Sequence, residues 1–222
     1  GECYKSFILN SDEQIDIIST NRSVYGYLSV KYGFQGDIFW GSSSVHTKSE
    51  IGPNNGKKFS LNEKLYLNKS QQNFVSKKIK YQNSKIEFIR VIKATNFDYF
   101  SDEAINNFFN KEFYVTKLTD RMGMRLEGPK IENNCETNIK SEGLVKGVIQ
   151  IPADGNPIIM LSDHGTIGGY PKIAVVVSAD LDRLAQTIPG SKIKFKLIEL
   201  SEAEKLFKLY NFETENIINN LI

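Results

Sequence analysis

The chain has 222 residues, 40% hydrophobic and 24% charged, which suits a globular protein with one large domain or two small ones. Its 28 basic and 26 acidic residues leave a formal net charge of +2, so no global field favours nucleic acid or an anionic membrane. No apolar run approaches the length of a membrane span, and we expect a cytoplasmic protein. The cysteines Cys3 and Cys135 have no metal-ligand spacing, so no metal site is expected.

The first third of the chain mixes strand patterns with one long loop. Alternation predicts two short strands between 4 and 18, a clearer strand over 25–30 and another over 61–68. Residues 36–58 are rich in Gly, Ser and Asn, which is typical of a long ordered loop that binds a ligand or covers the end of a barrel. The polar stretch 69–85, with Lys77, Lys78 and Lys80, reads as a solvated loop.

The middle of the chain carries one helix signal between strands. A strand is predicted over 86–92, followed by a short helix over 101–110 with Ser101 as N-cap and an acidic first turn. The apolar face of this helix consists of Ala104, Ile105, Phe108 and Phe109. Strands are predicted over 113–116 and from Gly123 onward.

The last third concentrates strands around glycine- and proline-marked turns. Strands are predicted over 148–151 and 158–161, the second buried on both faces, with a turn at Asp154-Gly155 between them. A helix over 179–186, a strand over 192–198 and a C-terminal helix over 201–222 with a Ser201–Glu204 capping box complete the pattern. These elements predict a mainly β, barrel-like fold with short capping helices and a C-terminal helix.

Two charged segments among glycines are candidate sites. If 121–125 is extended, Arg121 and Arg125 lie on one face and could bind a carboxylate or phosphate together. The alternative is that Asp120 and Glu127 neutralise them as local ion pairs. The second segment, 162–172, combines Asp163, His164 and Lys172 with three glycines, which let backbone approach a ligand closely.

The runs TDRMGMRLEGP (119–129) and SEGLVKGVIQIPADGNPIIMLSDHGTIGGYPKIAVVVSADLDRLAQTIPG (141–190) resemble a known family. It is the second-subunit, carboxyltransferase-type family of allophanate hydrolase-related proteins, which includes the C subunit of 5-oxoprolinase and part of urea carboxylase. The likeness is dense from 114 to 200 and weaker over 25–67. It implies a cyclophilin-like β-barrel forming one domain over 1–222, without the family's usual glycine-rich start. Local departures are Met124, Ala153 and Asn156.

The resemblance also implies site residues. We expect catalytic roles for Arg121, Asp163 and Lys172, and substrate-binding roles for Asp120, Arg125, Gln150, Asp154, Thr166, Gly168, Gly169 and Tyr170. Cationic side chains and glycine amides would stabilise a developing oxyanion. His164 is either a proton carrier or a surface histidine. Without a ligand, the two glycines would serve only a sharp turn of the barrel.

Three functions follow from the resemblance. The first is a subunit of an ATP-dependent complex that opens 5-oxoproline to glutamate, beside a homologous first subunit that resembles the B subunit of 5-oxoprolinase. The chain has no GxxxxGK[ST] loop, so ATP would be bound through the complex. The second is a carboxyltransferase that moves a carboxyl group to urea or a similar amide from biotin on a separate carrier. The third is a non-catalytic module that binds a kinase-inhibitor-like partner.

The expected lack of the family's first segment bears on assembly. A strand over 25–30 would then have an open edge, and open edges invite association. The sequence therefore predicts a homodimer, or dependence on the missing segment or on a partner protein.

Overall fold

The computed structural model describes residues 3–20, 23–68, 75–79, 87–134 and 138–219. The chain divides into two compact units, one of Gly1–Tyr25 with Lys77–Ile222 and one of Gly26–Ser76. We call them the barrel unit and the loop unit. Cys135, Lys80 and the predicted helix end at 220–222 lie outside the described residues. The single-domain arrangement stays a prediction.

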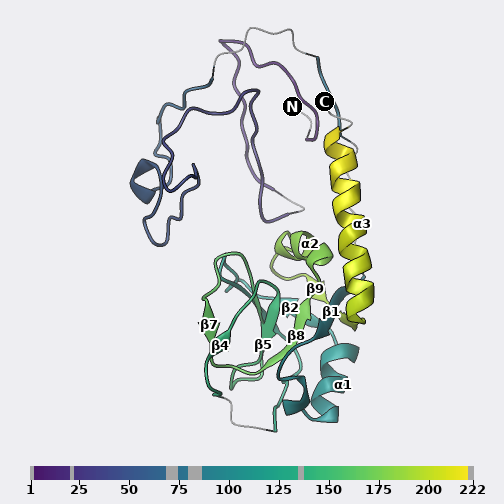
Figure 1. Ribbon diagram of the computed structural model, residues 1–222. Helices are drawn as coiled ribbons and strands as arrows, with labels where there is room; N and C mark the ends of the chain where they lie inside the picture. Colours follow the sequence, from purple (N-terminus) through teal and green to yellow (C-terminus); the bar gives the residue numbers. More distant parts are fainter. Residues whose placement is uncertain (1–2, 21–22, 69–74, 80–86, 135–137, 220–222) are drawn as a thin grey trace. The chain divides into compact units, whose positions relative to one another are not determined.

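The barrel unit is built on one eight-stranded sheet (Figure 1). Its order is β10-β1-β8-β5-β6-β3-β2-β9, and only the pairing of β1 with β10 is parallel. The two outermost strands, β9 and β10, are separated only by Lys194, so the sheet nearly closes on itself. The strands are β1 (Ile89–Lys93), β2 (Phe113–Val115), β3 (Gly123–Glu127), β5 (Val148–Gln150), β6 (Ile158–Met160), β8 (Lys172–Val176), β9 (Lys192–Ile193) and β10 (Phe195–Leu197). The predicted mainly β barrel is confirmed.

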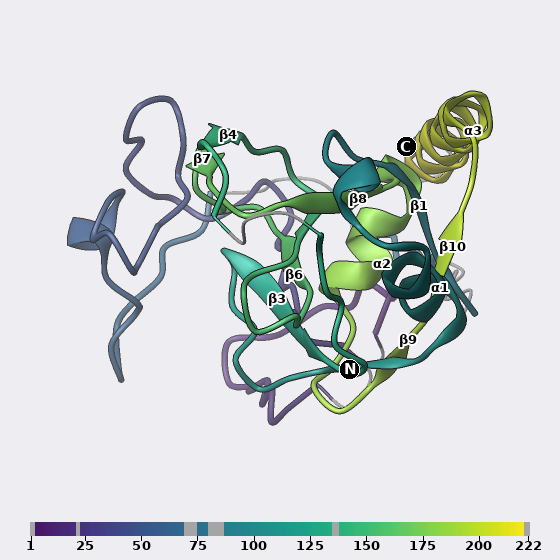
Figure 2. The same ribbon diagram turned by 90° about the horizontal axis from the view of Figure 1, so that it is seen from below.

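A small ribbon stands apart from this sheet. It pairs β4 (Glu142–Gly143) with β7 (Ile167–Gly168), antiparallel. Figure 2 shows the ribbon at the side of the barrel, where the chain runs on from β7 into β8. The three residues between Gly168 and Lys172 therefore connect the ribbon to the barrel wall, which makes this link the centre of the candidate site.

Aromatic side chains fill the core beneath α1 (Asp102–Asn110). Phe108, Phe113 and Phe195 are fully buried, and the rings of Phe108 and Phe195 stack at 4.5 Å. The Ser101 hydroxyl accepts a hydrogen bond from the Ala104 amide at 3.1 Å, so the predicted N-cap is present. The i, i+4 pattern thus places α1 against β10.

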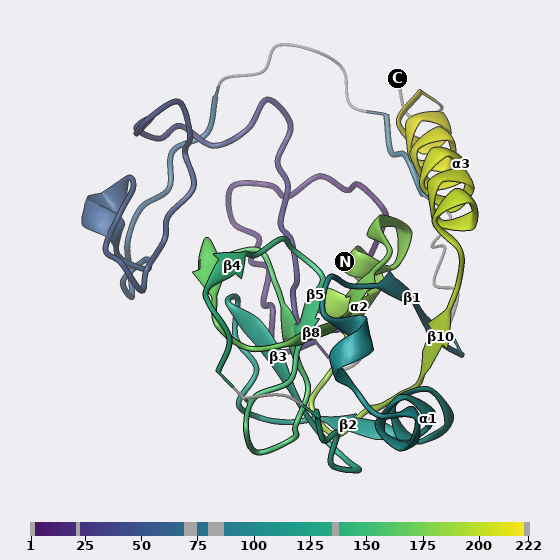
Figure 3. The same cartoon turned by 60° about the horizontal axis from the view of Figure 1, so that its bottom comes forward.

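The 3₁₀ turn η2 (Phe97–Tyr99) follows β1, and three further helical elements follow β8 and β10 (Figure 3). They are the 3₁₀ turn η3 (Ser178–Asp180), α2 (Leu181–Ala185) and α3 (Leu200–Asn219). Within η3, the fully buried carboxylate of Asp180 accepts hydrogen bonds from the backbone and the guanidinium of Arg90 on β1. This ion pair raises the pKa of Arg90 through the hydrogen bond to Asp180, and it fastens η3 to the barrel.

The start of α3 differs from the predicted capping box. The helix begins at Leu200, and the amides of Glu202 and Ala203 bond to the carbonyl of Glu199, so Ser201 lies inside the first turn. The packed face consists of Ala203, Leu206 and Tyr210, against Val177, Ala179 and Ile198. Leu209 lies off this face and is exposed. No helix in the described part of the chain is both long and apolar enough to cross a membrane.

The strands predicted over 4–18, 25–30 and 61–68 are wrong. The described residues there form only isolated bridges, such as Lys5 with Lys78 and Phe34 with Leu67. A strand needs a partner to satisfy its backbone groups, and none of these segments has a continuous one. The candidate edge at 25–30 is therefore not a strand, while the homodimer itself stays a prediction.

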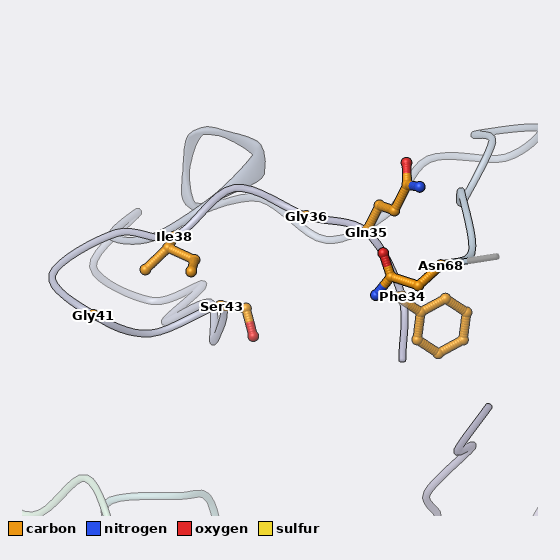
Figure 4. A pocket seen from close by; sticks show the side chains of 7 residues that line it. All are labelled: Phe34, Gln35, Gly36, Ile38, Gly41, Ser43 and Asn68. Atoms are coloured by element: carbon orange, nitrogen blue, oxygen red, sulfur yellow. The ribbon is translucent and has the colours of Figure 1, made fainter. Parts of the chain in front are cut away.

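The loop unit matches the predicted long loop over 36–58. Its one regular element among the described residues is the 3₁₀ turn η1 (Asn54–Gly56). An open pocket of about 550 Å³ lies in this unit and is lined by Phe34, Gln35, Gly36, Ile38, Gly41, Ser43 and Asn68. Figure 4 shows the side chains of Phe34, Gln35 and Asn68 gathered at one end of it. None of the predicted site residues belongs to this pocket.

Candidate functional site

Four residues stand directly opposite one another across four adjacent strands. Arg125 of β3 pairs with Ile158 of β6, which pairs with Gln150 of β5, which pairs with Lys172 of β8. The neighbouring row, formed by Met124, Ile159, Ile149 and Ala174, belongs to the core. Because successive residues of a strand point to opposite faces, the row that contains Lys172 lies on the outer wall of the barrel. Ile158 is accordingly only half-buried, so β6 is not buried on both faces as predicted.

A bulge in β8 turns Lys172 to that wall. Ile149 pairs with Ala174 whereas Gln150 pairs with Lys172, so Ile173 is an extra residue on β8. Ile173 and Ala174 both join the core. A bulge re-aims the side chains beyond it, and here it directs the lysine outward beside Gln150.

The glycine segment that joins the ribbon to β8 covers this part of the wall. A Cβ on Gly168 would lie 2.7 Å from Nε2 of Gln150, and one on Gly169 would lie 3.0 Å from the carbonyl oxygen of Ile139. Neither glycine takes the left-handed backbone, so a sharp turn is not the reason for them. They are required because the segment passes close to Gln150, whose Nε2 donates to the carbonyl of Tyr170 at 3.3 Å.

Lys172 is buried although it lies on the outer wall. Only 2% of the residue is exposed, and Nζ donates to Oε2 of Glu142 on β4 at 3.0 Å. The Thr95 hydroxyl donates to the same oxygen at 3.3 Å, and the Lys172 amide donates to Oδ1 of the buried Asn96 at 3.1 Å. A buried ammonium is costly unless it is paired, so Glu142 compensates the charge that the fold has buried. We call Gln150, Lys172, Glu142 and the 168–170 segment the ribbon site.

These contacts shift the pKa of the Glu142 carboxyl. The hydrogen bond from Lys172 lowers the pKa of Glu142, and the opposing effect of burial is smaller. A carboxyl with a folded-state pKa below its unfolded value stabilises the fold above the unfolded pKa, and that stability is lost as pH falls through the folded pKa.

This sign gives a pH prediction. The stability difference between the wild-type chain and Glu142→Gln should be constant near neutral pH and should shrink as pH falls below the ordinary titration range of a glutamate. Urea unfolding at a series of pH values measures it. A difference that grows toward acid pH would contradict the lowered pKa.

Arg121 and Asp163 form a second cluster. The guanidinium donates twice to the carboxylate, Nε to Oδ2 at 2.6 Å and Nη2 to Oδ1 at 2.9 Å. Asp120 accepts from the amides of Met122 and Gly123 and shapes the bend before β3. Since β3 begins at Gly123, Arg121 precedes the strand, and the prediction that it shares a strand face with Arg125 is wrong. The partner shown for Arg121 is Asp163, forty-two residues away.

Other predicted residues serve local structure. Asp154 accepts hydrogen bonds from the amide and side chain of Asn156. Burial would raise the pKa of Asp154, but these bonds together with the charges of Lys130 and Arg125 outweigh it, and the pKa is lowered. Gly155 takes a φ of 71°, as the Asp-Gly turn predicts. Nδ1 of His164 lies 2.6 Å from the carbonyl of Gly165, and the carbonyl of Thr166 accepts from Leu144 within the ribbon.

The structure thus brings Gln150, Gly168, Gly169, Tyr170 and Lys172 together, with Arg125 at the end of their row. Sequence reasoning missed Glu142, Thr95 and Asn96. Glu142 lies inside the run that resembles the family, yet nothing near it in the sequence pairs it with a lysine thirty residues on. Asn96 and Thr95 follow β1 without any motif. Among the described residues, no group of three or more His, Cys, Asp or Glu side chains could hold a metal ion.

The domain is a nearly closed β-barrel with a covered lysine–carboxylate pair on its outer wall. Residues 2–197 match the model of the carboxyltransferase domain, subdomains A and B, and the chain belongs to this family. It is 32% identical over 204 residues to the C subunit of 5-oxoprolinase from Haemophilus influenzae, covering 91% of this chain and 65% of that protein. It is 28% identical to the corresponding C subunit from Escherichia coli, covering 89% and 64%. The chain therefore spans slightly less than two thirds of the length of these relatives.

A solved structure shows the same fold. The crystal structure of the K. lactis urea amidolyase superposes with a TM-score of 0.75 at 25% identity, covering 85% of this chain and 13% of that one. The names of these relatives refer to 5-oxoproline and to urea, which are small amides.

Proposed function

We propose that this chain is a subunit of an ATP-dependent amidohydrolase complex that opens 5-oxoproline to glutamate. The buried Lys172 beneath the glycine segment carries the proposal, because a covered cation with neighbouring amides suits a small anionic substrate. Two relatives named as the C subunit of 5-oxoprolinase, at 32% and 28% identity, support this choice of substrate.

The chemistry of 5-oxoproline matches the charges at the site. The substrate has one carboxylate and one lactam carbonyl, whose oxygen gains negative charge when the ring carbon is attacked. Donors placed at a developing oxyanion are the usual source of large rate effects. Lys172 and the amides of Gly168 and Gly169 are the donors that we assign to this role, and Gln150 holds the glycine segment in place. The Lys172 ammonium has three N–H donors, and we assign one of them to the lactam oxygen and another to the carboxylate of the same substrate. We also propose catalytic roles in this reaction for Arg121 and Asp163.

The partners follow from this proposal. A homologous first subunit, similar to the B subunit of 5-oxoprolinase, would complete the complex and ATP would be bound through it. The test is to co-express the full-length protein with its neighbouring subunits and to measure ATP hydrolysis and glutamate formation that depend on 5-oxoproline. A complex that assembles but shows no such turnover would overturn the proposed substrate.

Gly168→Ala is a prediction about the cover of the site. Its Cβ would displace the amide of Gln150 and contact Leu144 Cδ1 at 3.0 Å. Both are the ends of flexible side chains, so we expect a small loss of stability, about 1 kcal/mol. The loss of activity should be larger than this destabilisation alone would cause. Gly143→Ala on the facing strand is the matched control, since nothing lies within 4 Å of its Cβ. Equal activity of the two variants would contradict a close-approach role for Gly168.

A second candidate is a carboxyltransferase that moves a carboxyl group from carboxybiotin to urea or a similar amide. The TM-score of 0.75 to urea amidolyase and the family model favour it. The biotin would be attached to a separate carrier. Supplying the assembled complex with carboxybiotin and urea tests this candidate, and unchanged carboxybiotin would argue against it.

A further inference from the structure

We propose that Glu142 is a specificity-determining residue, which holds the ribbon over Lys172 until the carboxylate of the substrate takes its place. The inference rests on the proposed function, because it names how that site selects an anionic substrate. Glu142 then acts as an internal competitor. Neutral amides such as urea would not displace it.

The exposure of the two partners is unequal. The side chain of Lys172 is 3% exposed, whereas that of Glu142 is 41% exposed. The ammonium therefore depends on Glu142 for its charge partner, while the carboxylate can be hydrated when it leaves. An incoming carboxylate exchanges one ion pair for another, and no charge is left buried alone.

The position of Glu142 on the ribbon gives this exchange a structural consequence. β4 pairs only with β7 among the described strands, and the contacts of Glu142 with Lys172 and Thr95 join it to the barrel side. Two further backbone hydrogen bonds hold the ribbon together. The Leu144 amide donates to the carbonyl of Thr166, and the Ile139 amide donates to the carbonyl of Gly169. A two-stranded ribbon is only marginally stable alone, so release of Glu142 should loosen it.

The experiment compares Glu142→Gln with Glu112→Gln in the assembled complex. Glu112 is a matched control, since its carboxylate accepts from Lys192 at 2.8 Å and Lys194 at 3.3 Å at similar exposure, away from the ribbon. We expect Glu142→Gln to lower KM for 5-oxoproline about threefold to tenfold, the range for weakening a charged contact of this kind. Glu112→Gln should leave KM unchanged. Unchanged KM in both variants, or a loss of kcat without a change in KM in Glu142→Gln, would overturn the role as competitor.

A second readout does not depend on turnover. Hydrogen exchange of the Ile139 and Leu144 amides should quicken about threefold to tenfold in Glu142→Gln, and in the wild-type protein when 5-oxoproline is added but not when its neutral amide is added. Faster exchange with both 5-oxoproline and its neutral amide, or with neither, contradicts the proposal.

This readout also separates the two proposals. If exchange responds to the carboxylate while the complex has no turnover, the proposed function fails and the competitor role stands. Should Glu142→Gln fold poorly, Thr95→Val, which removes one donor to Glu142, should give a smaller change in the same direction.

Discussion

Lys172→Met is expected to lower kcat/KM for 5-oxoproline by about 10²- to 10³-fold in the assembled complex, the usual cost of removing one donor from a developing oxyanion. Methionine keeps the apolar stem in the buried position and removes only the ammonium. The carboxylate of Glu142 loses its partner, but 41% of that side chain is exposed and water can solvate it. The loss of stability should therefore be roughly 1 kcal/mol, so that the variant stays folded.

Two controls separate charge from structure. In Lys172→Met/Glu142→Gln no carboxylate is stranded, and we expect it to recover stability while remaining as inactive as the single variant. Lys196→Met, at an exposed position of β10, should be fully active. If the double variant regains activity, the loss came from the stranded carboxylate, and Lys172 has no direct part in the chemistry.

The sequence predicted strands of the barrel where β-branched runs are bounded by glycine and proline turns, but it did not predict β8 (Lys172–Val176). Residues 148–161 are the clearest case, since the Asp154-Gly155 turn places β5 and β6 side by side. Alternation over 25–30, by contrast, predicted a strand that is absent. The difference is physical, because alternation reports on one segment, whereas a strand is stabilised by neighbours that lie elsewhere in the chain.

The candidate site was predictable only in part, for a related reason. The glycine segment and Lys172 are contiguous in the sequence and could be recognised as one motif. Their partners come from other elements: Glu142 from the ribbon, Asn96 from the end of β1, and Asp163 as the partner of Arg121. The bulge at Ile173 decides which face Lys172 points to, and no residue pattern indicated it.

Phe108→Ala is expected to have the largest effect on stability, about 3–5 kcal/mol, as for other fully buried phenylalanines. Its ring stacks on Phe195 and meets the rings of Phe109 and Phe113 at 5.0 and 5.9 Å. Alanine would leave a cavity between α1 and β10 that these rigid rings cannot fill.

Phe109→Ala on the same helix is the matched control for that variant. Its ring is only partly buried at the edge of the core, so the loss should be smaller, roughly 1–2 kcal/mol. Urea unfolding followed by far-ultraviolet circular dichroism measures both. Tryptophan fluorescence is unsuitable, because Trp40, the single tryptophan, belongs to the loop unit and is 86% exposed. The two phenylalanines differ mainly in how deeply they are buried between α1 and β10. Similar losses of stability in the two variants would therefore mean that packing at this interface is not a main source of the stability of the core.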